Sequence, residues 1–438
     1  MNKILQIFEK QGLTVENCIA DLKNSPIFAG SLGSKELFHS NIWAFLIEHE
    51  QEFLKAFFPE CGNQEVLSED KKGVRREFHH MDLTIETETN LFVIENKIKS
   101  LPRKEQLNNY RDGITGIKEF KSYKNNAEGI SFLLTGIPNK LPSSLEGLGW
   151  TYLNYYKIAE NIECIAYRIK ETNPEISDFA LKYAEVVKKL WALLQFTINS
   201  CREYLVFQPA DVSDENANKF VKWKQLDYLR ISDVFQKLNF DVFTSLVEKH
   251  KPDTRMKCHT DFTRNYALSE FYYEHEFNVT GEKKGHFRIG VQIQEYQFRW
   301  YVDICIPNEQ LNDREIIGKL YSPFKTATTD SKWFVEYNGD IYNGEKKIST
   351  PVDLILKTSM RGNTKGKKTE YCSFITANDV FLYQYFTLNS VCNKEELMNE
   401  VLDFMRCAKK VFNDQSTWQS LNEVFPEYFP STNPVPVL

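Results

Sequence analysis

Two short apolar stretches joined by a polar turn constrain the fold of this chain more than any other feature. They are "VRREFHHMDLTIET" (residues 74–87) and "LFVIENKI" (residues 91–98), and the turn "TETN" connects them. Their composition is typical of strands, and the short turn predicts an antiparallel hairpin. A hairpin that pairs Glu86 with Leu91 also sets Asp82 directly opposite Glu95.

The second stretch ends in three polar residues, Glu95, Asn96 and Lys97. Successive strand residues face opposite ways, so Glu95 and Lys97 share one face while Asn96 points to the other. Cross-strand neighbours have Cβ atoms about 5 Å apart, so the carboxylates of Asp82 and Glu95 would lie side by side. Because like charges repel at that distance, we expect a divalent cation such as Mg²⁺ between them.

Lys97 then has a chemical role. An ammonium group beside the metal can orient an attacking water or lower its pKa, which is the chemistry of phosphodiester hydrolysis. In the alternative interpretation, Glu95 and Lys97 form an exposed ion pair on an edge strand and Asp82 is an incidental neighbour. The apolar run "LFVI" before Glu95 favours the metal site, since charged residues at the end of a buried strand usually serve a function.

The remainder of the N-terminal half predicts an α/β arrangement. Helical spacing of apolar residues over 35–57 indicates one long helix or two consecutive helices. A helix is expected in "PRKEQLNNYRDGI", strands in "GISFLLTGIP" and "WTYLNYY", and helices near 156–171 and 177–200. This order predicts an α/β domain over residues 1–200, with a mixed central sheet flanked by helices.

Residues 201–438 have a different sequence pattern, which predicts a second, α+β domain. A helical pattern near 223–249 precedes "SEFYYEHEFNV", "HFRIGVQIQ" and "YQFRWYVDICI", whose alternation predicts antiparallel strands. Further strands are expected in "WFVEYNG" and "PVDLILKT", and a helix from about Lys394 to Val411. The aromatic residues of "YQFRWYVDI" can either stack on bases or form a core, and the core is favoured.

Composition limits the class of protein. The chain has 438 residues, enough for about two to three domains. No apolar stretch reaches the ~18 residues of a spanning helix, and the N-terminus lacks the apolar segment of a signal peptide, so we expect a cytoplasmic protein without a membrane partner. The formal net charge is −6, so any nucleic-acid surface must be a local basic patch. Such patches lie within 97–124 and in "KTSMRGNTKGKKTE" (residues 357–370).

Asp82, the apolar strand after it and Glu95-Asn96-Lys97 resemble the signature of the PD-(D/E)XK nuclease superfamily. The predicted order helix, strand, strand, helix, strand also matches the core of that superfamily, the restriction-endonuclease-like fold. The resemblance covers about residues 30–160 and does not extend to the C-terminal half. Met81 replaces the proline that often precedes the motif aspartate, at a position that varies widely in the superfamily.

Two further motifs carry the resemblance. "EQLNNY" is similar to the Q-x-x-x-Y motif of the RecB-type branch and places Gln106 and Tyr110 on one helix face. "ELFHSN" places Glu36 and His39 in the upstream helix, where that superfamily often has further metal-site residues. The plainer alternatives are half-buried helix residues for Gln106 and Tyr110, a charge favoured by the helix dipole for Glu36, and a helix-surface side chain for His39.

The resemblance implies a role for each of these residues. Asp82 and Glu95 would bind Mg²⁺, for which Mn²⁺ can substitute, together with the backbone carbonyl of Asn96. Glu36 would bind directly or through water, and His39 would add to the metal shell. Lys97 would serve the attacking water. Gln106 and Tyr110 would position the lysine or the substrate backbone.

The function expected is therefore a Mg²⁺-dependent nuclease, with DNA favoured over RNA. A role in prokaryotic defence or DNA processing is suggested by the kind of family alone. Two alternatives stay open: a catalytically silent nucleic-acid-binding or regulatory protein, and a nuclease switched on by a ligand that the C-terminal half senses. That half could also supply substrate choice or the contacts of a homo-oligomer.

Overall fold

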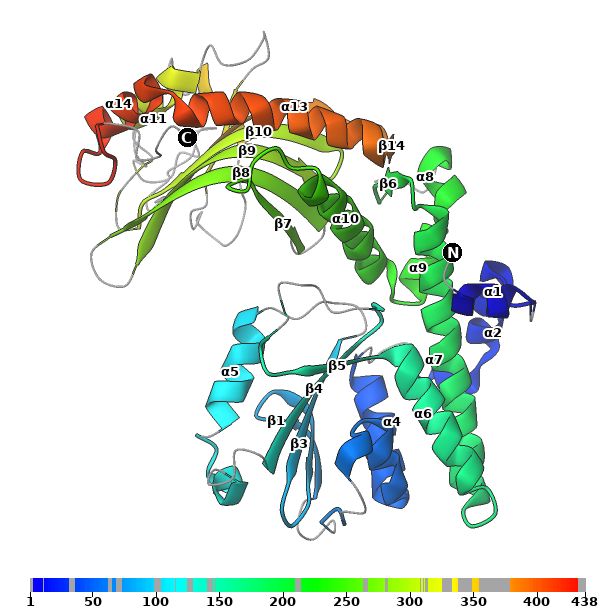
Figure 1. Ribbon diagram of the computed structural model, residues 1–438. Helices are drawn as coiled ribbons and strands as arrows, with labels where there is room; N and C mark the ends of the chain where they lie inside the picture. Colours follow the sequence, from blue (N-terminus) through cyan, green and yellow to red (C-terminus); the bar gives the residue numbers. More distant parts are fainter. Residues whose placement is uncertain are drawn as a thin grey trace, which may run out of the picture. The chain divides into compact units, whose positions relative to one another are not determined.

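The computed structural model describes residues 3–10, 12–30, 36–61, 65–67, 73–97, 104–114, 116–123, 129–139, 145, 147–208, 214–262, 267–279, 283–307, 309, 311, 314–324, 333–337, 349–353 and 379–431. The chain divides into two units (Figure 1). Unit 1 comprises Met1–Arg202 and Asn218–Leu238, and unit 2 comprises Glu203–Ala217 and Asn239–Leu438. No helix in these described ranges is long and apolar enough to span a membrane.

Unit 1 is built on a mixed sheet of five strands in the order β1-β2-β3-β4-β5. The strands are β1 (Val74–Phe78), β2 (Met81–Glu86), β3 (Leu91–Lys97), β4 (Ile130–Gly136) and β5 (Thr151–Asn154). The first three pair antiparallel, whereas β3, β4 and β5 pair parallel. A parallel pair needs a crossover connection, and α5 (Lys104–Ile114) provides it between β3 and β4.

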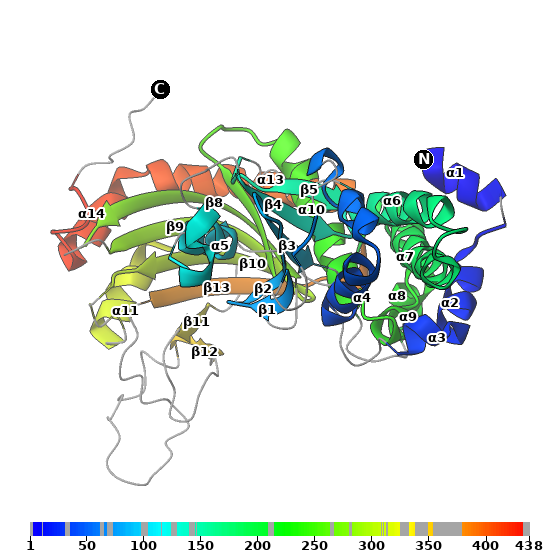
Figure 2. The ribbon, with the colours of Figure 1, turned by 90° about the horizontal axis from the view of Figure 1, so that it is seen from below.

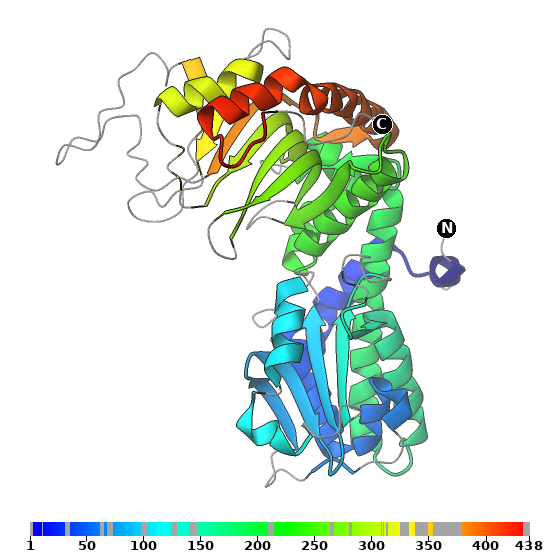
Figure 3. The same cartoon turned by 60° about the vertical axis from the view of Figure 1, so that its left-hand side comes forward.

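Helices cover both faces of this sheet. Figure 1 shows α5 on one side and α4 (Glu36–His49), α6 (Tyr155–Arg168) and α7 (Pro174–Ser200) on the other. Figure 3 shows α6 and α7 packed side by side along the sheet. The other helices that include residues of unit 1 are α1 (Lys3–Lys10), α2 (Val15–Asn24), α3 (Pro26–Ala29), η1 (Gln51–Ala56), η2 (Pro59–Cys61), η4 (Lys118–Tyr123), α8 (Glu215–Phe220), α9 (Trp223–Tyr228) and α10 (Ser232–Lys249).

Unit 2 contains a seven-stranded sheet in the order β12-β11-β13-β10-β9-β8-β7, with every neighbouring pair antiparallel. Its strands are β7 (Lys257–Phe262), β8 (Ala267–Asn278), β9 (Lys284–Gln294), β10 (Gln297–Cys305), β11 (Phe334–Tyr337), β12 (Ser349–Pro351) and β13 (Asp379–Thr387). Figure 2 looks onto one face of this sheet, with α13 (Lys394–Asn413) behind it. The other elements are β6 (Tyr204–Val206), which pairs with β14 (Val391–Asn393), and α11 (Arg314–Tyr321), η7 (Ser322–Phe324) and α14 (Gln415–Val424).

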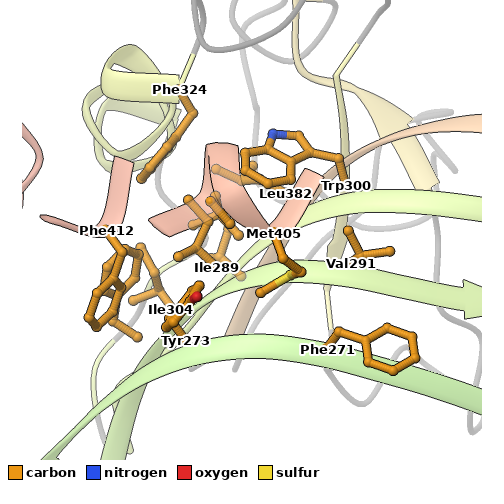
Figure 4. Close-up of a cluster of buried hydrophobic side chains, with 14 of the residues drawn as sticks. Phe271, Tyr273, Ile289, Val291, Trp300, Ile304, Phe324, Leu382, Met405 and Phe412 are labelled. Atoms are coloured by element: carbon orange, nitrogen blue, oxygen red, sulfur yellow. The ribbon is translucent and has the colours of Figure 1, made fainter. Parts of the chain in front are cut away.

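One face of the seven-stranded sheet forms the core of unit 2. Figure 4 shows Ile289, Val291 and Ile304 of the strands meeting Met405 and Phe412 of α13. These side chains alternate with residues of the opposite face, as the period of a strand requires. The aromatic residues Phe298 and Trp300 of β10 belong to the same core, which confirms the core assignment for this part of "YQFRWYVDI".

The predicted fold class is confirmed: a mixed, helix-flanked sheet occurs in the N-terminal half and an antiparallel sheet in the C-terminal half. Two local predictions were wrong, and several strands were not predicted. Residues 74–87 were expected as one strand but form β1 and β2, and the helix expected at 223–249 is broken into α9 and α10 at Arg230, whose φ is +62°. Strands β6, β7, β13 and β14 were not predicted. The expected strand "PVDLILKT" lies largely outside the described residues.

Candidate active site

The hairpin of β2 and β3 brings the two predicted acids to one edge of the sheet. The structure pairs Leu83 with Ile94 and Glu86 with Leu91, which confirms the predicted register. The paired residues end at Leu83 and Ile94, and the same register continued by one residue sets Asp82 opposite Glu95. The backbone N–H of Asn96 donates a 2.6 Å hydrogen bond to Asp82 Oδ2, so the Asp82 carboxylate is tied to the strand that carries Glu95.

The segment before Asp82 was predicted as part of one continuous strand. In the structure, His79 and His80 form a two-residue turn that separates β1 from β2. Their φ values are +50° and +68°, and Phe78 pairs with Met81 across the turn. Positive φ at both central residues is the geometry of a tight hairpin. The pairs typical of such turns are Asn-Gly, Asp-Gly and Gly-Gly, so the His-His pair did not indicate a turn.

Glu95 is the most buried charged group at this edge, with 1% of its surface exposed. Burying a carboxylate costs free energy unless other groups compensate the charge. Lys97 Nζ lies 2.7 Å from Glu95 Oε1, and Gln106 Nε2 donates to the same oxygen over 2.9 Å. The structure thus shows the Glu95 and Lys97 side chains on one face of β3, as the alternation of a strand requires.

Helix α5 contributes Gln106 and Tyr110 to the same face. Gln106 Nε2 lies 2.9 Å from Glu95 Oε1 and also 2.9 Å from the Tyr110 hydroxyl. Partial burial raises the pKa of Tyr110, and the nearby charges of Glu95 and Asp82 raise it further. The structure therefore brings together Asp82, Glu95, Lys97, Gln106 and Tyr110.

Asn96 points to the opposite face, and its contacts there were not predicted from the sequence. Its amide Nδ2 donates to Ser40 Oγ over 3.1 Å, and its Oδ1 accepts from the Tyr155 hydroxyl. Thr135 Oγ1 lies 3.4 Å from both Asn96 Oδ1 and the carbonyl oxygen of Glu95. These three partners of Asn96 come from α4, β4 and α6, which are far apart in the sequence. No local sequence motif therefore indicates the contacts.

His39 is buried beside these contacts. It is 3% exposed, so it is not the helix-surface side chain of the plainer alternative. Its Nδ1 lies 2.7 Å from the Tyr183 hydroxyl, which also accepts a 2.7 Å hydrogen bond from Trp43 Nε1. Burial lowers the pKa of His39 to about 3. Its ring meets that of Tyr155 edge to face with centroids 5.0 Å apart.

In the described part of the chain, the hydrogen bond of His39 goes to Tyr183 and not to Asp82 or Glu95. Glu36 is the first residue of α4, and its side chain lies outside the described residues. The metal-binding roles of Glu36 and His39 therefore stay predictions. Most side chains of the two basic patches, including all of residues 357–370, also lie outside what the structure describes.

The donor set at the sheet edge fits a hard divalent cation. It offers the carboxylates of Asp82 and Glu95 and the backbone carbonyl of Asn96, all oxygen donors. Mg²⁺ is usually held by one or two carboxylates and keeps several waters, so it does not need a larger protein cage. No group of three or more His, Cys, Asp and Glu side chains suited to a metal occurs among the described residues.

Comparison with known proteins agrees with this geometry. Residues 27–185 match the family model of the PD-(D/E)XK nuclease superfamily, a range that contains α4, the five-stranded sheet, α5 and α6. No curated protein matches the chain, and no solved structure matches it. The assignment to the RecB-type branch, with its Q-x-x-x-Y motif, stays a prediction. Residues 27–185 of this chain are thus similar to the PD-(D/E)XK nuclease superfamily.

Proposed function

We propose that the chain is a Mg²⁺-dependent nuclease that hydrolyses phosphodiester bonds, with DNA as the favoured substrate. One observation carries the proposal: Lys97 and Gln106 both meet the buried carboxylate of Glu95, at 2.7 Å and 2.9 Å, on the edge where Asp82 is tied to Asn96. The match of residues 27–185 to the model of a nuclease superfamily supports the same chemistry.

The proposed roles follow from the position of each group. Asp82, Glu95 and the Asn96 carbonyl hold the cation, Glu36 joins directly or through water, and His39 is a further candidate ligand. When bound, Mg²⁺ neutralises the charge that develops on the phosphoryl oxygens. Lys97, next to Glu95, orients the attacking water and favours its deprotonation.

Gln106 and Tyr110 act on the same carboxylate. The Gln106 amide donates to Glu95 Oε1, and so fixes the direction in which the carboxylate presents its oxygens. Tyr110 lies within hydrogen-bonding distance of Gln106 and holds that amide in place. Both residues are proposed to position the metal ligand or the substrate backbone.

Residues 1–200 are proposed as the nuclease domain, and residues 201–438 as a domain for substrate choice, activation or oligomer contacts. A role in prokaryotic defence or in DNA processing would suit a nuclease of this kind. Mn²⁺ is expected to replace Mg²⁺, because both accept oxygen ligands.

The test is cleavage of plasmid DNA, linear DNA, single-stranded DNA and RNA with Mg²⁺, Mn²⁺ or a chelator. Wild type should cleave with metal and not with chelator, and Lys97→Ala should not cleave. Lys188→Ala is the matched control, since Lys188 forms a similar 2.6 Å ion pair with Glu163 away from the site. Cleavage that needs no metal, or that survives Lys97→Ala, would overturn the proposal.

Two other outcomes separate the alternatives. A wild-type protein that is inactive on all substrates but binds DNA with a steep salt dependence would be a binding module. Activity that appears only with cell extract or an added nucleotide would indicate a nuclease controlled by a ligand.

A further inference from the structure

We infer that Asn96, Tyr155 and Thr135 form a positioning network that holds the metal-binding edge of β3 from behind. This inference rests on the proposed function and names residues that act through the ligands, without touching substrate. Asn96 is fully buried, and its backbone N–H bonds directly to the carboxylate of Asp82. Any movement of Asn96 therefore moves the acid to which it is bound.

The sheet explains how Tyr155 reaches this position. The parallel strands align Asn96 with Thr135 and Thr135 with Leu153, so the ends of β3, β4 and β5 lie at one edge. Strand β5 ends at Asn154, and α6 begins at Tyr155 with the Asn154 side chain accepting a 2.8 Å bond from Lys157 N–H. The capped start of α6 thus fixes Tyr155 immediately beyond the edge that carries Asn96.

The tyrosine is itself held rigidly. Tyr155 is 1% exposed and its ring packs against His39 and Trp43, with centroids 5.0 Å and 5.6 Å apart. His39 and Trp43 are in turn both bonded to the Tyr183 hydroxyl of α7. A continuous set of contacts therefore leads from α7 through α4 and α6 to Asn96 and then to Asp82.

A hydroxyl network of this kind matters because catalytic geometry tolerates little displacement. Groups behind a metal ligand orient it, and their removal typically lowers metal affinity or activity by about 10-fold to 100-fold. Thr135 adds a second hydroxyl, shared between the Asn96 side chain and the Glu95 carbonyl. The network thus contacts Asn96, whose carbonyl is the proposed ligand, and Glu95, the residue before it.

The decisive variant is Tyr155→Phe, which removes one hydroxyl and keeps the ring that packs on His39 and Trp43. Tyr152→Phe is the matched control: Tyr152 lies three residues earlier, and its hydroxyl donates a 2.6 Å bond to the Pro138 carbonyl and not to Asn96. Thr135→Val tests the second hydroxyl with nearly the same side-chain shape.

Three readouts are measured on the full chain: Mn²⁺ affinity by calorimetry, kcat and KM for DNA cleavage, and amide exchange of a peptide covering 91–97. Tyr155→Phe should weaken Mn²⁺ binding and lower kcat, each by about 10-fold or more, and speed exchange at Asn96, with KM little changed. Tyr152→Phe should leave all three close to wild type.

The outcomes distinguish this inference from the proposed function. If wild type neither binds Mn²⁺ nor cleaves, the proposed function fails, and the network has no ligands to position. If wild type does both and Tyr155→Phe equals Tyr152→Phe in metal affinity and kcat, the proposed function survives and the positioning network is overturned.

Discussion

Gln106 Nε2 lies 2.9 Å from Glu95 Oε1 and thereby connects helix α5 to the buried carboxylate on β3. Gln106→Met keeps the length of the side chain and removes this donor. We expect kcat for cleavage to fall by about 10-fold to 100-fold, because the carboxylate loses a group that orients it. Single-turnover cleavage measures the effect.

Asn109→Ala provides the control for this prediction, since Asn109 is an exposed residue of the same helix. It should retain wild-type activity. Equal activity of Gln106→Met and Asn109→Ala would show that Gln106 is only a half-buried helix residue.

Lys97 should matter for catalysis and not for metal affinity. Its ammonium lies 2.7 Å from Glu95 Oε1, where it competes with a cation for the same carboxylate. We expect Lys97→Met to lower kcat by about 100-fold or more, the usual contribution of a proton-transfer group. Mn²⁺ affinity, measured by calorimetry, should stay the same or increase. A joint loss of metal binding and cleavage would instead assign Lys97 a structural role.

The burial of His39 predicts how the stability of α4 depends on pH. Its pKa is about 3 in the folded protein and about 6.5 in an unfolded chain. Between these values the unfolded chain binds more protons, so stability falls as the pH drops from about 6.5 towards 3. His39→Asn keeps an amide near the Tyr183 hydroxyl and cannot be protonated.

Amide exchange of peptides from α4, corrected for intrinsic rates, measures this effect. The destabilisation caused by His39→Asn should be larger at pH 7 than at pH 4.5, because only wild type loses stability on acidification. The same destabilisation at both pH values would contradict the assigned burial of a neutral imidazole.

Removing the hydroxyl group from two buried tyrosines, Tyr301 and Tyr183, should change the free energy of unfolding in opposite directions. Within the described residues, the Tyr301 hydroxyl on β10 has no hydrogen-bond partner, although the residue is 1% exposed. The Tyr183 hydroxyl has two partners, His39 and Trp43. Tyr301→Phe should raise the free energy of unfolding by about 1 kcal/mol, and Tyr183→Phe should lower it by about 1–3 kcal/mol.

Urea unfolding of the full chain, with the free energy measured for each unfolding transition, tests the Tyr301→Phe and Tyr183→Phe variants. Each variant serves as the control of the other, because both remove a single buried hydroxyl. Loss of stability in both variants would mean that the Tyr301 hydroxyl has a partner in solution.

Local patterns were sufficient to predict part of the site. The turn after Glu86 and the alternation of β3 set the hairpin register, and so the neighbourhood of Asp82 and Glu95. The resemblance to the Q-x-x-x-Y motif singled out Gln106 and Tyr110, and their spacing placed them on one face of α5, where their side chains meet. These features depend on residues close together in sequence, so periodicity and turn chemistry reveal them.

The remainder depends on long-range contacts or unusual backbone angles. Ser40, Thr135 and Tyr155 converge on Asn96 from three separate elements, and each is an ordinary residue for its position. The turn at His79 and His80 was missed because both residues adopt positive φ without glycine or asparagine. Tertiary structure selects these conformations, and a single sequence carries little sign of them.

The most direct test of the account is a crystal structure of the protein soaked in Mn²⁺, with the ion located by its anomalous scattering. We expect one peak between the carboxylates of Asp82 and Glu95, within direct coordination distance of an oxygen of each, as for a small octahedral cation. A saturated crystal with no ion between these two side chains, or with the ion bound only elsewhere, would contradict the proposed active site.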